Sequence, residues 1–166
     1  RGSSAASDVY KRQALYSPGH AKHHYSFYDE FSGTLFMGDT LGLIYPHGDF
    51  VQPNLPPPDF DKEILFKTLD SFEKLEINQL AIAHFGIHKN ARELIKDAKE
   101  SIENWILFIS NIENLSNDDA SNELLKWLIR NYESLGIDNE TIKNYIGNGN
   151  FVMQIEGIRN YLRRRS

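Results

Sequence analysis

Short apolar runs separated by turn residues form the first clear pattern in the chain, from residue 24 onward. Segments 24–30 and 34–38 are rich in aromatic and apolar residues, and 31–33 (Phe-Ser-Gly) between them has the composition of a tight turn. Segment 79–83 is a short apolar run of the type found in buried strands. The pattern predicts a hairpin of two strands, followed later by a third strand.

After residue 60, apolar residues mostly recur at helical spacing. Segment 43–60 separates this helical part from the first two predicted strands. That segment holds five of the six prolines, so we expect a loop there and neither a helix nor a central strand. Capping residues mark the expected helix starts, with Glu93 placed to pair with Asn90 and Asp119 with Ser116. The helices are expected around Ile64–Leu75, from Asn90 to about Ile109, from Ser116 to Gly136, from Asp138, and from about Phe151 to the arginine tail at 163–165.

Composition and charge narrow the class of protein. The chain has 166 residues, of which 40% are hydrophobic, which suits one globular core. The net charge of -5 gives no basic surface for nucleic acid or anionic lipid, so neither partner is expected. There is no cysteine, which leaves imidazole, carboxylate and backbone oxygen as the available metal ligands. No apolar run is long enough to span a bilayer or to form a signal peptide, so we expect a cytoplasmic protein.

The chain divides into three parts by pattern. Residues 1–13 lack apolar periodicity and resemble translated cloning sequence, so we interpret them as a non-native or disordered leader. Residues 14–112 hold the predicted strands and the first two helices. Residues 113–166 are expected to form a helical extension packed on that domain. Overall the order of elements predicts an α/β protein.

Residues with metal-ligating side chains follow three predicted strands, each beside a glycine. His20 lies in the turn after a strand that begins near Ala14, Asp39 follows segment 34–38, and His84 follows the third strand. Because the carboxyl ends of aligned strands meet at one edge of a sheet, His20, Asp39 and His84 are expected to converge there. Taken singly, these residues would be a turn histidine, a turn cap and a hydrogen-bonded core histidine.

Three motifs in order carry a family resemblance: SPGHAKHH at 17–24, LFMGDTLG at 35–42 and AHFG at 83–86. Together they resemble the later motifs of the metallo-β-lactamase superfamily. The resemblance implies the C-terminal half of an αββα sandwich, followed by C-terminal helices. It also implies that His20 ligates a first metal ion, Asp39 bridges two ions and His84 ligates the second.

The family's signature His-x-His-x-Asp-His is absent from this sequence. That signature supplies most ligands of the first ion and lies upstream of the motifs found here. We therefore expect this chain to be a C-terminal fragment, inactive alone, of a metal-dependent hydrolase. Such a fragment would expose a sheet face that is normally covered, so it should aggregate or form a homodimer through that face.

The resemblance implies a dinuclear site in the complete protein. Two divalent ions would activate a metal-bound water, the expected nucleophile, against an ester, thioester, lactone or similar bond of a small-molecule substrate. Zinc is favoured by the histidine-rich ligands, and iron or manganese also suits imidazole with carboxylate. The remaining histidines are candidates for a supporting shell or substrate pocket: His23, His24, His47 and His88.

A second class of function stays open. The chain could be a non-enzymatic helical interaction module, or a pseudoenzyme that lacks the first metal-binding motif. The aromatic residues Phe27, Tyr28, Phe36 and Phe85 are expected in the core, as are Trp105 and Trp127, which lie on apolar helical stripes.

Overall fold

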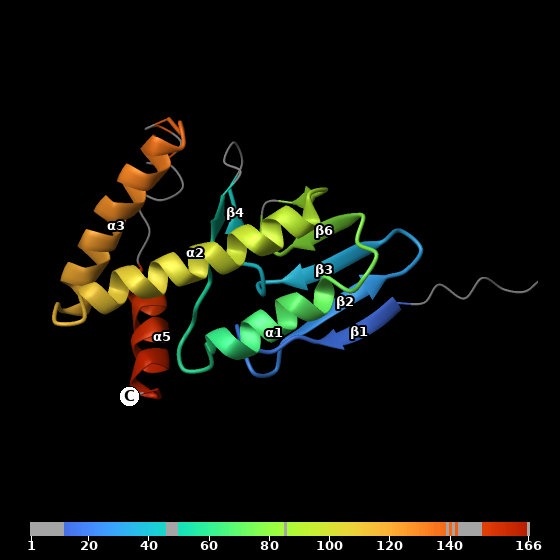
Figure 1. Ribbon diagram of the computed structural model, residues 1–166, viewed down its shortest axis with the longest axis horizontal. Coiled ribbons are helices and arrows are strands. Elements are labelled where there is room, and N and C mark those ends of the chain that lie inside the picture. The colour runs from blue at the N-terminus through green and yellow to red at the C-terminus, as the bar shows by residue number, and fades with distance from the viewer. Residues whose placement is uncertain are drawn as a thin grey trace, which may run out of the picture.

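The computed structural model of the protein describes residues 12–45, 50–84, 86–138, 140, 142 and 151–165. A five-stranded sheet, a separate two-stranded sheet and four long helices make up this part of the chain (Figure 1). The elements are β1 (Arg12–Tyr16), β2 (Tyr25–Asp29), β3 (Thr34–Gly38), β4 (Leu43–Ile44), β5 (Val51–Gln52), α1 (Lys62–Phe72), β6 (Gln79–Ile82), β7 (Ile87–His88), α2 (Ala91–Asn111), α3 (Asn117–Ser134) and α5 (Val152–Arg163).

The large sheet has the order β1-β2-β3-β6-β7. The strands β1, β2 and β3 pair antiparallel, which confirms the predicted hairpin, and β6 then pairs parallel to β3 after the helical crossover through α1. Because β1 and β3 both run antiparallel to β2, the strands β1, β3 and β6 all point the same way. Their carboxyl ends therefore lie at one edge of the sheet, as expected for the residues that follow them.

The sheet begins earlier than the sequence indicates. Arg12 and Gln13, which fall in the predicted leader, belong to β1 and pair with Asp29 and Tyr28 of β2. These two residues are therefore ordered, because strand pairing uses main-chain groups and needs no apolar side chain at an exposed edge. Residues 1–11 lie outside the described part of the chain.

The helices follow the predicted apolar stripes. Asp61 caps α1 by accepting a hydrogen bond from the backbone N–H of Ile64, and Ser116 caps α3 in the same way through Asp119. Asn90 differs from expectation, because its side chain caps no backbone group of α2 and instead lies 3.4 Å from the Glu93 carboxylate. The helix expected from Asp138 falls largely on residues outside the described ranges. None of the described helices is long and apolar enough to cross a membrane.

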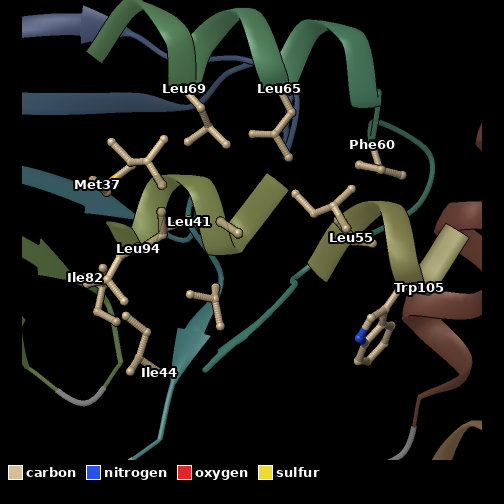
Figure 2. Packing of buried hydrophobic residues seen from close by; sticks show 14 of the residues in the cluster. Met37, Leu41, Ile44, Leu55, Phe60, Leu65, Leu69, Ile82, Leu94 and Trp105 are labelled. Carbon is tan, nitrogen blue, oxygen red and sulfur yellow. The ribbon is translucent and has the colours of Figure 1, made fainter. Parts of the chain in front are cut away.

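The core lies between one face of the large sheet and the helices (Figure 2). Leu69 of α1, Met37 of β3 and Leu94 of α2 are fully or almost fully buried in it. Trp105 is also buried, and Trp127 packs its ring on Phe108 at 4.9 Å, so both tryptophans serve packing as expected.

The opposite face of the sheet is open and apolar. Phe27 and Phe36 are cross-strand partners and are 51% and 47% exposed, which corrects their expected place in the core. The error arises because alternate residues of a strand face opposite sides, so Tyr28 is buried while Phe27 is not. Phe85 lies outside the described residues. An exposed apolar sheet face is what the fragment hypothesis predicts.

The helix α5 holds the proline-rich loop against the domain. A Cβ atom placed at Gly157 would lie 1.8 Å from the carbonyl oxygen of Leu55, so only glycine permits this approach. The rings of Phe60 and Tyr161 lie 5.4 Å apart, and Arg164 donates to the carbonyl of Pro58 at 3.1 Å. The C-terminal helix therefore fixes the position of the loop.

Candidate metal centre

His20 follows β1 and is nearly buried, with 8% of its surface exposed. Its Nδ1 atom lies 2.8 Å from the backbone carbonyl oxygen of Asn54. A carbonyl oxygen can only accept, so Nδ1 carries the proton and donates it, which leaves the Nε2 lone pair available. This tautomer, fixed by a backbone carbonyl, is the arrangement that metal-ligating histidines use.

Asp39 and His84 come together at the ends of two adjacent parallel strands. Asp39 follows β3, His84 lies two residues after β6, and their atoms Oδ1 and Nε2 are 3.4 Å apart. Both side chains remain partly exposed, at 37% and 51%, so an ion in solvent can reach them. The Oδ1 atom of Asp39 is nevertheless enclosed and has no hydrogen-bond partner among the described residues.

His24 lies at the start of β2, between the positions of His20 and Asp39. Its ring meets that of His20 edge-on with the centroids 5.9 Å apart. Burial lowers the pKa of His24 below its ordinary value, and the neighbouring His20 lowers it further, so the neutral imidazole is favoured. The negative charge of Asp39 acts in the opposite direction and has a smaller effect.

A buried chain of hydroxyl groups supports His24. Ser17 Oγ and Thr40 Oγ1 lie 2.7 Å and 2.9 Å from His24 Nδ1, and Ser26 Oγ donates to Ser17 Oγ at 3.0 Å. All three hydroxyl residues are almost fully inaccessible to solvent. A buried network with every member paired fixes side-chain positions, so the His24 ring is held firmly beside the centre.

Gly38 makes room for this ring. Its φ angle is +54°, and a Cβ atom at this position would lie 2.6 Å from His24 Nε2. The sequence motif places this glycine directly before Asp39, so the same residue admits His24 and turns the chain toward the carboxylate.

The remaining histidines have different surroundings. His23 is exposed beside the centre. His88 is half-buried in β7, and its Nε2 atom is enclosed without a hydrogen-bond partner in the described structure. His47, a candidate for the substrate pocket, lies outside the described residues.

The structure thus brings Asp39 beside His84, and it places His20 against the ring of His24. Within the described ranges, no group of three or more histidine, aspartate or glutamate side chains is arranged to hold a metal ion. The strand order explains why His20 does not join Asp39 and His84. His20 follows β1, and β2 separates β1 from β3, so these strands lie two strand spacings, or about 10 Å, apart. The donors present therefore fit part of a metal site, with the right atom types and an enclosed carboxylate oxygen that accepts no hydrogen bond among the described residues.

Three supporting residues have no clear sequence signal. Asn54 acts through its main chain, so its residue type carries no information about its contact with His20. Ser17 and Thr40 belong to the SPGH and GDT motifs, and their place close to His20 and Asp39 in the sequence is the only hint of their role.

Comparison with solved structures identifies the fold. A metallo-beta-lactamase family protein from Thermus thermophilus aligns over 94% of this chain and 45% of its own, with 18% identity and a TM-score of 0.63. An archaeal metallo-beta-lactamase superfamily protein from Sulfolobus tokodaii is 28% identical over 55% of this chain and 33% of its own, with a TM-score of 0.46. A metallo beta lactamase from Erythrobacter litoralis is 13% identical over 62% and 43%, with a TM-score of 0.44.

No known family model and no curated protein matches the chain. The chain spans less than half the length of each of these three structures. At this level of identity, the alignment with the Thermus protein establishes architecture and not activity. The chain therefore has the fold of part of a metallo-β-lactamase superfamily protein.

Proposed function

We propose that this chain is part of a dinuclear metal-dependent hydrolase. His20 would ligate the first divalent ion, Asp39 would bridge the two ions and His84 would ligate the second. When bound, the ions would lower the pKa of a water molecule and polarise the ester, thioester, lactone or similar bond of a small-molecule substrate. The remaining ligands would come from sequence outside this chain.

The observation that carries the proposal is the Asp39–His84 contact. An enclosed carboxylate oxygen without a hydrogen bond has lost its hydration, which is unfavourable unless positive charge close by compensates. Its neighbour, His84 Nε2 at 3.4 Å, belongs to a ligand type that shares divalent ions with carboxylates. His20, with Nδ1 engaged by Asn54, supports the same interpretation.

The other residues of this edge have positioning roles. Asn54 would orient His20 through its carbonyl group, and the Ser17–Ser26–Thr40 hydroxyls would keep the His24 ring beside the centre. Zinc best suits this histidine-rich set, while manganese and iron also accept imidazole and carboxylate ligands.

Calorimetric titration of the purified chain with zinc or manganese chloride tests the ligand assignment. We expect saturable binding that weakens at least about tenfold in Asp39→Ala and in His84→Ala. His23→Ala is the matched control, because His23 lies at the same edge but is exposed, and its affinity should stay within about twofold. Equal affinities in all three variants, or no binding by the unmodified chain, would refute the assignment.

The complete gene product tests the reaction. We expect an in-frame His-x-His-x-Asp-His motif upstream of this chain and metal-dependent hydrolysis by the complete protein. There, Asp39→Ala and His84→Ala should each remove most activity while His47→Ala should retain most of it. If all three variants were equally active, the bridging and second-ion roles would be wrong.

A further inference from the structure

A cleft of about 400 Å³ opens between α2, α3 and β5 and shares no residue with the candidate metal centre. In Figure 1, β4 and the later turns of α3 stand on the same side of α2. The described residues that line the cleft are Phe50, Val51, Asp97, Glu100, Ser101, Asn104, Trp105, Trp127, Leu128, Asn131, Tyr132, Ser134 and Leu135.

Aromatic rings from α2, from α3 and from the residue before β5 belong to this lining. Trp105 comes from α2 and Trp127 from α3. Tyr132 also belongs to α3, and its ring stacks on that of Phe50 with the centroids 3.8 Å apart. Stacked and packed rings keep fixed positions, so they give the cleft a preformed apolar lining.

The charges of the cleft all have one sign. Asp97 and Glu100 lie one helical turn apart on α2, and the described lining includes no lysine, arginine or histidine. Lys99 stands beside Glu100 in the sequence, but its ammonium group is bonded to Asp70 and Glu73 on the α1 side. The cleft therefore has acidic groups whose charge is not balanced by its own lining.

Asp97 is already disfavoured as a free carboxylate. Burial raises its pKa first, and the nearby negative charges of Glu93 and Glu100 raise it further. A cation in the cleft would reverse both effects, because it would pair with the carboxylate and offset the repulsion between like charges.

We propose that this cleft binds a small organic cation, an ammonium group carried on an aromatic or aliphatic body. The ammonium group would lie against Asp97 and Glu100, and the apolar body would lie against the half-buried Trp127 and the exposed Leu135. Ammonium ions are attracted by carboxylates, whereas a neutral molecule of the same shape gains no such attraction and an anionic one is repelled. A volume of about 400 Å³ suits a small ligand of this kind. The proposal is independent of the hydrolase activity.

Tryptophan fluorescence provides a direct assay. The chain has two tryptophans, and both line the cleft, so the whole tryptophan emission reports on its occupancy. The probe is 2-phenylethylammonium, and the matched controls are 2-phenylethanol, which is neutral, and phenylacetate, which is anionic. We expect a saturable emission change with the ammonium probe, weakened by added salt, and no saturable change with either control at the same concentrations.

Two substitutions locate the cation. Asp97→Asn and Glu100→Gln keep the side-chain shape and should each lower the affinity for 2-phenylethylammonium about tenfold, the loss expected for one charge-assisted contact. Glu103→Gln is the control, because Glu103 is an exposed acid of the same helix that does not line the cleft. Glu100 is exposed as well, so its variant tests the proposal even if Asp97→Asn alters the fold. The same response to all three probes, or unchanged affinity in both cleft variants, would overturn the proposal.

Discussion

Replacing Gly38 with alanine should damage the candidate centre through a collision that the structure locates. Gly38 has a φ of +54°, and the new Cβ atom would lie 2.6 Å from Nε2 of His24. That ring cannot move freely, because its other side is bonded to the buried hydroxyls of Ser17 and Thr40. The substitution therefore adds a backbone cost and a packing cost at one position.

The two costs can be assigned separately. Holding an alanine in the left-handed region costs about 1–2 kcal/mol. Forcing an extra methyl group into a packed site typically costs about 1–3 kcal/mol more. We therefore expect Gly38→Ala to lower the free energy of unfolding by about 2–5 kcal/mol, a large part of the stability of a domain of this size.

Gly136 provides the matched control. Its φ is +80°, also in the left-handed region, but a Cβ atom there would meet nothing within 4 Å. Urea unfolding followed by circular dichroism should show that Gly136→Ala loses only the backbone cost. Adding His24→Ala to Gly38→Ala should remove most of the excess, since the colliding ring is gone. Equal losses for the two glycine variants, or an excess that persists without His24, would refute this account of the site.

Two further expectations concern pH and association. The pKa of His24 is lowered from 6.5 in the folded chain, so the unfolded chain takes up the proton first as the pH falls below 6.5. The free energy of unfolding should therefore decrease as the pH falls toward the lowered pKa of the folded chain. Urea unfolding measured from about pH 7.5 to about pH 5 should show this decrease, and His24→Gln should flatten it. The open sheet face should cause self-association, which sedimentation velocity would detect. Changing Phe27 and Phe36 to serine should shift the chain toward monomer. An unmodified chain that is monomeric at every concentration would contradict the role of this face.

Periodicity predicts the helices well because their apolar stripes are long. The stripe from Leu94 to Ile109 is buried along its whole length, so tertiary packing and sequence pattern agree. Strands carry less information, because a short aromatic run has two apolar faces and only the fold decides which is covered. Phe27 and Phe36 were misplaced for this reason, since the helices pack on the other face of the sheet.

The candidate site is only partly visible in the sequence. Ligand-type residues beside glycines mark the strand ends, and the parallel pairing of β3 with β6 brings Asp39 and His84 together. The distance of His20 from that pair depends on β2 lying between β1 and β3, which no local pattern encodes. The contact with Asn54 is also invisible in the sequence, because a main-chain carbonyl is common to every residue.

The contact at Gly157 connects α5, near the C-terminus, with the position of His20, near the N-terminus. Leu55, whose carbonyl meets Gly157, is the residue after Asn54, whose carbonyl fixes the tautomer of His20. Shortening α5, or joining a bulky partner directly after Arg165, would remove the contact that holds the proline-rich loop. The Asn54 carbonyl could then shift, and the His20 imidazole would no longer be held in one orientation. The metal affinity of such shortened or fused chains would then depend on whether α5 is intact. A low affinity would reflect the choice of chain ends and not a poor set of ligands.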